Sequence, residues 1–313
     1  MTDQRSEPGL ATARGDAPEP DDLQPADHER ILRSLRPMGP GAVLDSAFDL
    51  LRLRFRRIVG IAACLYVPIR ILDLVSMIAS GDAEERYQIG PAILLMGGDS
   101  GWALVVALLQ SFALSVLGLC VGHLVVRMVD GADASFRELM SLALRRSWVA
   151  LLVMPLAFVV RAPLSCIPLG FLLGDALVFT TSVIAGAERL GPWRAFRRSL
   201  ALTRRSYGPM LAVVLGGLLI SQILRISFYA GPVLLTANFS TSEAVLTVVA
   251  QAGALVVLVA EPLTACIAAR AYLDLRCRNE GADLRRRLHE RFGPQPPPTA
   301  PTAPAAPAVG VHA

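Results

Sequence analysis

Charged residues are scarce in this chain of 313 residues, and lysine is absent. Only 18% of the residues are charged, whereas about 25% is usual for soluble domains. All 30 basic residues are arginine, and with the many alanines, prolines and glycines this usage indicates a GC-rich bacterial coding sequence. Hydrophobic residues make up 53% of the chain and cluster in long runs, so the composition predicts a membrane protein rather than a soluble domain.

The five cysteines and four histidines form no metal-binding or disulfide pattern. No CxxC pair and no adjacent cysteine and histidine occur, and most of the cysteines lie in apolar runs, where a thiol behaves as a small hydrophobic group. A disulfide framework is typical of small secreted chains, and this chain is not of that kind. We therefore expect no disulfide scaffold, no metal and no other cofactor.

Motifs that would name a reaction are also missing. The chain contains no Walker loop, dinucleotide fingerprint, HExxH or GxSxG, and no facing set of nucleophile, base or metal ligands can be assembled from it. Residues 1–29 are polar and acidic without an apolar stretch, so we expect no cleaved signal peptide and insertion through an internal span. The sequence predicts a protein that is not an enzyme.

Six apolar segments are long enough to cross a membrane. Residues 148–187 would make a helix of about 60 Å at 1.5 Å per residue, roughly twice the ~30 Å hydrocarbon core. Because Pro163 and Pro168 lie near the middle of this segment, we predict a hairpin there. The predicted spans are 58–79, 103–126, 148–164, 168–187, 207–235 and 244–272.

The arginines predict the orientation of these spans. They are frequent before the first span and in every second connection, whereas residues 80–102 contain only Arg86 and residues 236–243 contain none. The positive-inside rule then places both termini in the cytoplasm of a bacterium, with the protein in its cytoplasmic membrane. We predict a six-helix membrane domain over residues 38–292. Its flanking tails, over residues 1–37 and 293–313, have the composition of disordered segments.

A short phrase occurs twice, each time just before an apolar run: SLALRRSW at residues 141–148 and SLALTRRSY at 199–207. As helices, residues 39–55, 131–148 and 191–207 each carry an apolar stripe that ends in an aromatic, with arginines mainly opposite. Such helices lie in the membrane interface. We predict three parallel units, each an amphipathic interfacial helix followed by a helical hairpin. The stripes comprise Leu44, Phe48, Leu51 and Phe55; Phe136, Met140, Leu144 and Trp148; and Trp193, Phe196, Leu200, Thr203 and Tyr207.

Arginines of these interfacial segments are expected to lie among anionic lipid head groups, which attract each arginine by about 1 kcal/mol near the surface. They are Arg52, Arg56, Arg145, Arg146, Arg197, Arg198, Arg204 and Arg205. The expected partners are therefore anionic membrane lipids, with membrane or cytoplasmic proteins as further candidates and no nucleic acid.

The two ends of the membrane domain resemble a known family. They read MGPGAVLDSAFDLLRLRFRRIVGIAACLYVP from residue 38 and AYLDLRCRNEGADL from residue 271. Both are similar to the ends of a bacterial six-helix membrane family related to the membrane domain of glycerophosphoryl diester phosphodiesterases. The resemblance covers about residues 38–285 and implies the fold. It implies no activity, because the metal-dependent catalytic barrel of those enzymes has no counterpart in this chain.

Six ionisable residues lie within the predicted spans: Arg70, Asp73, Arg161, Asp175, Arg225 and Glu261. A charge at the centre of a membrane helix costs about 2.5–3.5 kcal/mol, so each of them needs a partner, water or an interface. Counted from the aromatic at the start of each unit, the three arginines lie about 20–27 Å along their helices, in the outer half of the membrane. Glu261, just before Pro262, is expected nearer the inner half.

Three interpretations of these charges are open. In the first, the arginines reach the outer head groups or pair with aspartates, Arg70 with Asp73 and Arg161 with Asp175. In the second, three arginines against two aspartates form a water-accessible outward pocket, positive enough to hold an anion such as a lipid phosphate. In the third, Asp175 and Glu261 relay protons or ions.

The favoured function is a non-enzymatic membrane protein that organises partners or anionic lipid at the cytoplasmic face. The alternative is a carrier or permease component for a small anion or a lipid-like molecule, which the internal repeat and the outer charges would suit. Against the carrier, the spans lack the matched Gly/Pro breaks that mark a central binding site. A membrane-embedded enzyme would need a catalytic set that the sequence does not offer.

Overall fold

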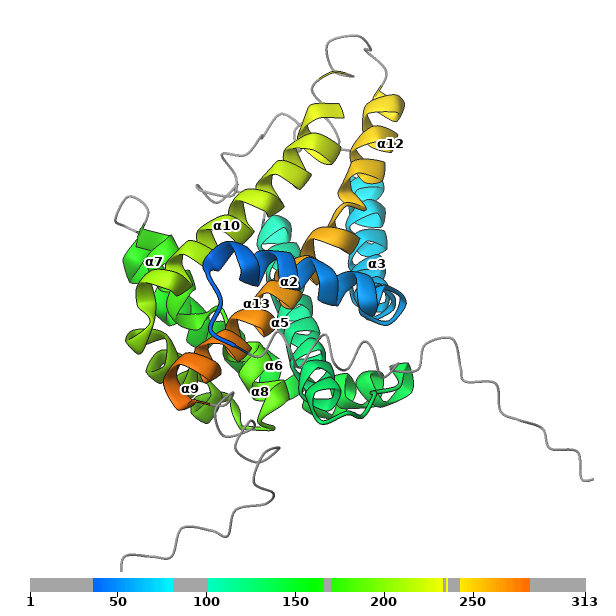
Figure 1. Ribbon diagram of the computed structural model, residues 1–313. Helices are drawn as coiled ribbons and strands as arrows, with labels where there is room; N and C mark the ends of the chain where they lie inside the picture. The colour runs from blue at the N-terminus through cyan, green and yellow to red at the C-terminus, as the bar shows by residue number, and fades with distance from the viewer. Residues whose placement is uncertain (1–35, 81–100, 166–169, 233–234, 236–242, 282–313) are drawn as a thin grey trace, which may run out of the picture.

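The computed structural model describes residues 36–80, 101–165, 170–232, 235 and 243–281, and these residues form helices with no β-strand among them (Figure 1). Most of the predicted tail over residues 1–37 and all of the tail over 293–313 lie outside them. The elements are α2 (Pro40–Leu53), α3 (Phe55–Ser80), α5 (Gly101–Val129), α6 (Phe136–Ser165), α7 (Gly170–Val178), α8 (Thr181–Ala187), α9 (Pro192–Arg205), α10 (Tyr207–Arg225), the π-helix η2 (Ile226–Ala230), α12 (Glu243–Ala254) and α13 (Val257–Glu280).

Six helical segments are long and apolar enough to cross a membrane, so the chain is an all-α, multi-pass membrane protein, as predicted. The predicted hairpin in residues 148–187 is confirmed, because this region belongs to two separate spans. The spans are Phe55–Ser76, Val105–Val129, Phe136–Arg161, Gly170–Ala187, Tyr207–Tyr229 and Ala252–Glu280.

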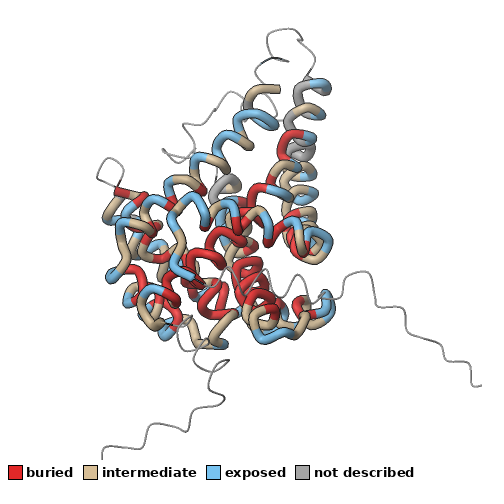
Figure 2. Tube along the Cα trace, in the orientation of Figure 1, coloured by how far each residue is buried: buried red, intermediate tan, exposed pale blue. Residues whose placement is uncertain are grey.

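Helix α13 is the central element of the bundle. It packs against α2, α3, α5, α8, α9 and α10, and it is buried along most of its length (Figures 1 and 2). Small side chains such as Ala265, Ala268 and Ala269 allow these neighbours to approach its backbone closely. Gly281 ends the helix in the left-handed conformation, with φ 59°, as glycine commonly does after a helix.

Helices α5 and α8 are in close backbone contact. A Cβ atom on Gly122 would lie 2.3 Å from the carbonyl oxygen of Val183, and one on Gly186 would lie 1.9 Å from that of Leu119. Gly118 and Gly122 of α5 are spaced as in a GxxxG motif, which membrane helices use for close packing. The spacing between α5 and α8 is therefore set by glycine.

The predicted repeat is present in two of the three units. Both α2 and α9 begin with Pro at the first helical turn and end at a non-helical residue, Arg54 with φ −125° and Ser206 with φ −134°, before the next helix starts. The middle segment, 131–148, was wrongly predicted to form a separate interfacial helix. It runs into α6, which is continuous from Phe136 to Ser165. Pro209 explains in part why α9 is separate from α10 while the middle segment is continuous with α6. The ring of Pro209 interferes with helix formation around residues 205–206, whereas Trp148 is followed by Val and Ala.

The predicted apolar stripes mark the faces that pack on the bundle only in part: Leu51, Phe196 and Thr203 are buried, but other stripe residues are exposed. Helix α2 buries Val43, Ala47 and Leu50, while Phe55 is exposed. Helix α9 buries small residues such as Ala195 and Ser199, while the side chain of Trp193 is 58% exposed. The smaller side chains face protein, and several of the large apolar ones remain on the outside.

Candidate functional site

Each of the six predicted intramembrane charges has an oppositely charged partner. Arg70 Nη1 lies 3.7 Å from Asp73 Oδ2 on α3, and Arg161 forms an ion pair with Asp175 that joins α6 to α7. These are the two pairs expected from the sequence. The third pair was not expected: Arg225 Nη2 of α10 lies 2.5 Å from Glu261 Oε1 of α13. Glu261 is therefore level with Arg225, and the prediction that it lies nearer the inner half was wrong.

Two of these pairs belong to one cluster. The charge of Arg70 interacts with those of Arg225 and Glu261 as well as with that of Asp73. Tyr66 is fully buried beside them and donates a hydrogen bond of 3.4 Å to the carbonyl oxygen of Gln110. We name Tyr66, Arg70, Asp73, Arg225 and Glu261 the Glu261 cluster; the pair Arg161–Asp175 is separate from it.

The Glu261 cluster is electrically balanced. Two arginines face two carboxylates, and Glu261 itself is 8% exposed. The anion pocket predicted as the second interpretation depended on an unpaired third arginine, and Arg225 has a carboxylate partner. The geometry therefore supports the first interpretation, in which the charges pair with one another and join helices.

The predicted basic residues divide into two groups at the arginine-rich end, where α3, α6 and α10 begin. Arg146 donates hydrogen bonds to the carbonyl oxygens of Ala185, at 3.0 Å, and Arg189, at 2.6 Å. Arg198 pairs with Glu188 and Glu280, so these two arginines hold the fold together. The other predicted arginines are exposed: Arg52, Arg56, Arg145, Arg197, Arg204 and Arg205.

A polar layer surrounds the last turns of α13, and most of its contacts join residues far apart in the sequence. Tyr272 donates a 3.0 Å hydrogen bond to Glu188, and Arg276 lies 3.3 Å from Glu280. The carboxylate of Asp274 accepts a 2.8 Å hydrogen bond from the backbone N–H of Met38 and pairs with Arg278 at 2.6 Å. This layer attaches the start of the domain and the α8–α9 connection to the central helix. The i,i+4 pair of Asp274 and Arg278 can be expected from the sequence, whereas the contacts of this layer with Met38 and Glu188 cannot.

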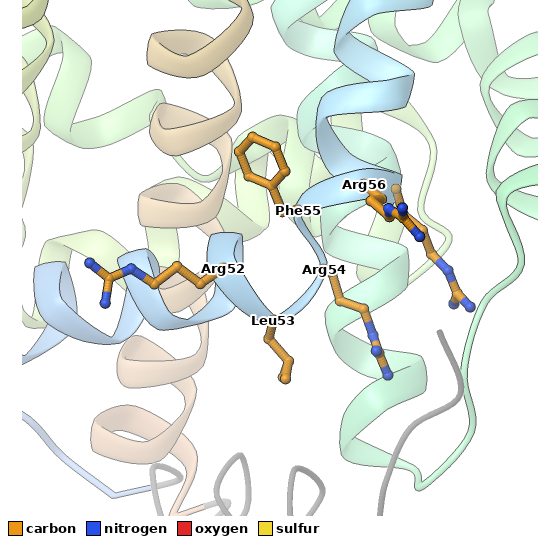
Figure 3. Close-up of a pocket in the computed structure, with 6 residues that line it drawn as sticks. Arg52, Leu53, Arg54, Phe55 and Arg56 are labelled. Atoms are coloured by element: carbon orange, nitrogen blue, oxygen red, sulfur yellow. The ribbon is translucent and has the colours of Figure 1, made fainter. Parts of the chain in front are cut away.

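The corner between α2 and α3 carries a small basic cavity of about 130 Å³. Its arginines do not converge: in Figure 3 the side chains of Arg52, Arg54 and Arg56 point in different directions. Arg54 is instead held by Asp133, at 3.1 Å. Arg57 also contacts Asp133, at 2.6 Å, and donates to the carbonyl oxygen of Ala134. This corner is a basic surface attached to the α5–α6 connection.

Within the described residues, no group of three or more His, Cys, Asp or Glu side chains is arranged to hold a metal ion. Comparison of the chain with models of protein families, with curated proteins and with solved structures finds no match.

Proposed function

We propose that this protein is a non-enzymatic membrane protein that gathers anionic lipid at the cytoplasmic face of a bacterial membrane. The observation that carries the proposal is the division of the arginines at the arginine-rich end. Arg146 and Arg198 are bound within the fold, whereas Arg52, Arg56, Arg145 and Arg205 remain exposed; the exposed Phe55 and Trp148 lie near the first three in sequence.

Exposed arginines beside exposed aromatic residues suit the lipid interface. Phe55 follows the α2–α3 corner directly, and Trp148 follows Arg145 by three residues, so the basic groups of α2 and α6 have an apolar anchor nearby. Arginine binds phosphate through two parallel N–H donors and is weakly hydrated, which favours it over lysine at head-group phosphates. Each such arginine contributes about 1 kcal/mol of attraction to an anionic leaflet.

The proposal adopts the expected orientation, with both termini in the cytoplasm. It also retains the resemblance to the phosphodiesterase membrane domain as an expectation about ancestry, without enzymatic activity. The carrier alternative has less support than before, because the charges on which it depended are paired.

The test measures which lipids surround the protein. Wild type and the variant Arg52→Gln/Arg56→Gln/Arg145→Gln/Arg205→Gln are extracted from the same bacterial membrane with a polymer that keeps a lipid annulus, and the lipids are quantified by mass spectrometry. We expect wild type to be enriched in anionic phospholipid relative to the whole membrane, and the Gln variant to lose the enrichment.

The matched control replaces the same four residues by Lys, which keeps the charge and should retain most of the enrichment. Equal lipid composition around wild type and the Gln variant would contradict the proposal. Protein that co-purifies with wild type alone would instead favour a protein partner at this face.

A further inference from the structure

An apolar groove runs between α6 and α9, close to the arginine-rich end. It has a volume of about 650 Å³, and its lining residues are all apolar; those that shape its walls are Leu152, Leu156 and Val159 of α6 and Trp193, Phe196 and Leu200 of α9. This volume lies within the roughly 300–1,000 Å³ of small-molecule sites. Trp193 and Phe196 stack with ring centroids 5.8 Å apart, so one wall is an aromatic platform.

The groove has the direction of an acyl chain. Its α6 wall is a single strip of residues at three- and four-residue steps, from Leu152 to Val160. At 1.5 Å per residue, this strip follows the membrane-spanning helix for about 12 Å. Lipid chains run in the same direction, and residues of α9 form the opposite wall.

Basic side chains border the groove along α9. Arg197 lies between Trp193 and Leu200 in sequence and next to their strip on the helix, and Arg204 lies four residues beyond Leu200. Both are exposed, and within the described part of the chain no acidic residue pairs with either of them. Arg198, one residue further round, is occupied by Glu188 and Glu280.

We propose that this groove binds one acyl chain of an anionic phospholipid, with its phosphate held by Arg197 and Arg204. The apolar walls accept the chain, the stacked Trp193 and Phe196 lie at the level where chain meets head group, and the two arginines complement the phosphate charge. The inference rests on the proposed function and deepens it, because it turns a general lipid preference into one retained molecule at a defined position.

The experiment is native mass spectrometry of the full chain after mild detergent extraction and washing, with the bound lipid identified by fragmentation. We expect one anionic phospholipid on wild type. Arg197→Gln/Arg204→Gln should weaken its retention about tenfold or more, since hydrogen bonds from charged groups are lost. Arg194→Gln is the matched control on the same helix, because Arg194 is exposed on a different side from the groove strip.

A second pair of variants tests the chain-binding part. Val159, 68% exposed in the groove wall, is replaced by Trp to fill the groove, and Val75, 55% exposed on α3, is replaced by Trp as the control. Val159→Trp should displace the lipid while Val75→Trp retains it. Both positions are on the surface, so folding is expected to survive, and gel filtration checks it.

Three results would overturn the inference: wild type without a bound phospholipid, a bound lipid that is not anionic, or equal retention by Val159→Trp and Val75→Trp. The outcome is separable from that of the proposed function, since the annulus experiment alters Arg52, Arg56, Arg145 and Arg205 and leaves the groove intact. If the annular enrichment is lost but the groove lipid is retained, the inference about the groove stands.

Discussion

The ion pair between Arg225 and Glu261 offers the sharpest test of how this bundle is held together. It joins α10 to α13 through a contact of 2.5 Å, and Glu261 is only 8% exposed. The side chain of Arg225 is 40% exposed, so Glu261 is the buried partner. Removing one partner of a fully buried pair typically costs about 3–5 kcal/mol, which is the upper limit here, whereas replacing both by apolar residues is often neutral or stabilising. We therefore expect Glu261→Leu to be strongly destabilising and Arg225→Leu/Glu261→Leu to be close to wild type.

The two single variants should differ in a definite direction. Without Glu261, Arg70 and Arg225 face each other with only Asp73 to balance them. Without Arg225, the charge of Arg70 still interacts with Glu261. Arg225→Leu should therefore lower the free energy of unfolding less than Glu261→Leu, by an amount of the order of 1 kcal/mol for two neighbouring like charges in high dielectric.

The assay is reversible unfolding in mixed micelles with increasing SDS, followed by tryptophan fluorescence for wild type, both single variants and the double variant. Changes in unfolding free energy at independent sites add within about 0.5 kcal/mol. Because Arg225 and Glu261 form a pair, the change in the double variant should differ from the sum of the two single changes by several times that amount. If the double variant is as unstable as the sum of the two single variants, then the pairing is not what stabilises this level of the bundle, and the reasoning fails.

Three further predictions concern packing, the polar layer and orientation. Gly186→Ala places a Cβ atom 1.9 Å from a backbone carbonyl oxygen of α5 and should lower the free energy of unfolding by about 1–3 kcal/mol or more in the same assay. The control is Gly208→Ala, which has open space around it and should leave the free energy of unfolding unchanged. Asp274→Ala leaves the backbone N–H of Met38 without its acceptor and should lower the free energy of unfolding by about 1–3 kcal/mol. Proteolysis around α2 should also become faster. Unchanged proteolysis would mean that this contact does not anchor α2. A reporter enzyme active only outside the cytoplasm should be active when inserted within residues 81–100 and inactive when fused after residue 281, and the reverse result would invert the orientation.

The positions of the spans could be predicted because hydrocarbon imposes one rule on the backbone. Every N–H and C=O group in the core of the bilayer must be bonded internally, so a long apolar run is read directly as a helix. The length of residues 148–187, together with Pro163 and Pro168, gave the hairpin for the same reason. No equally strong constraint determines which of these helices pack against one another.

The inward faces could not be predicted because apolarity does not distinguish protein from lipid. Around α9, Phe196 packs inward but Trp193 does not, and Ala195 and Ser199 take the places next to the bundle. Close packing between membrane helices favours small residues, so large apolar stripes mark the lipid side at least as often as the core. The GxxxG spacing of Gly118 and Gly122 was a readable signal of this kind, and it marks the α5–α8 contact.

The pairing of charges depends on contacts that sequence spacing does not give. Arg70 and Asp73 share one helix and could be paired from their separation of three residues. Arg225 and Glu261 lie on different helices, 36 residues apart, and nothing in their spacing shows that they lie at the same depth.

Helix α13 explains why the groove lies between α6 and α9. Its Glu261 holds α10 at one level, and its Glu280 holds Arg198 of α9 at the other, so the α9–α10 corner is fixed at two points about 28 Å apart along one helix, at 1.5 Å per residue. The side of α9 that carries Arg198 is thereby turned toward α13. The strip with Trp193 is left toward α6, where the described residues that line the groove are all apolar. A polar anchor on one side of α9 thus leaves the apolar groove on the other.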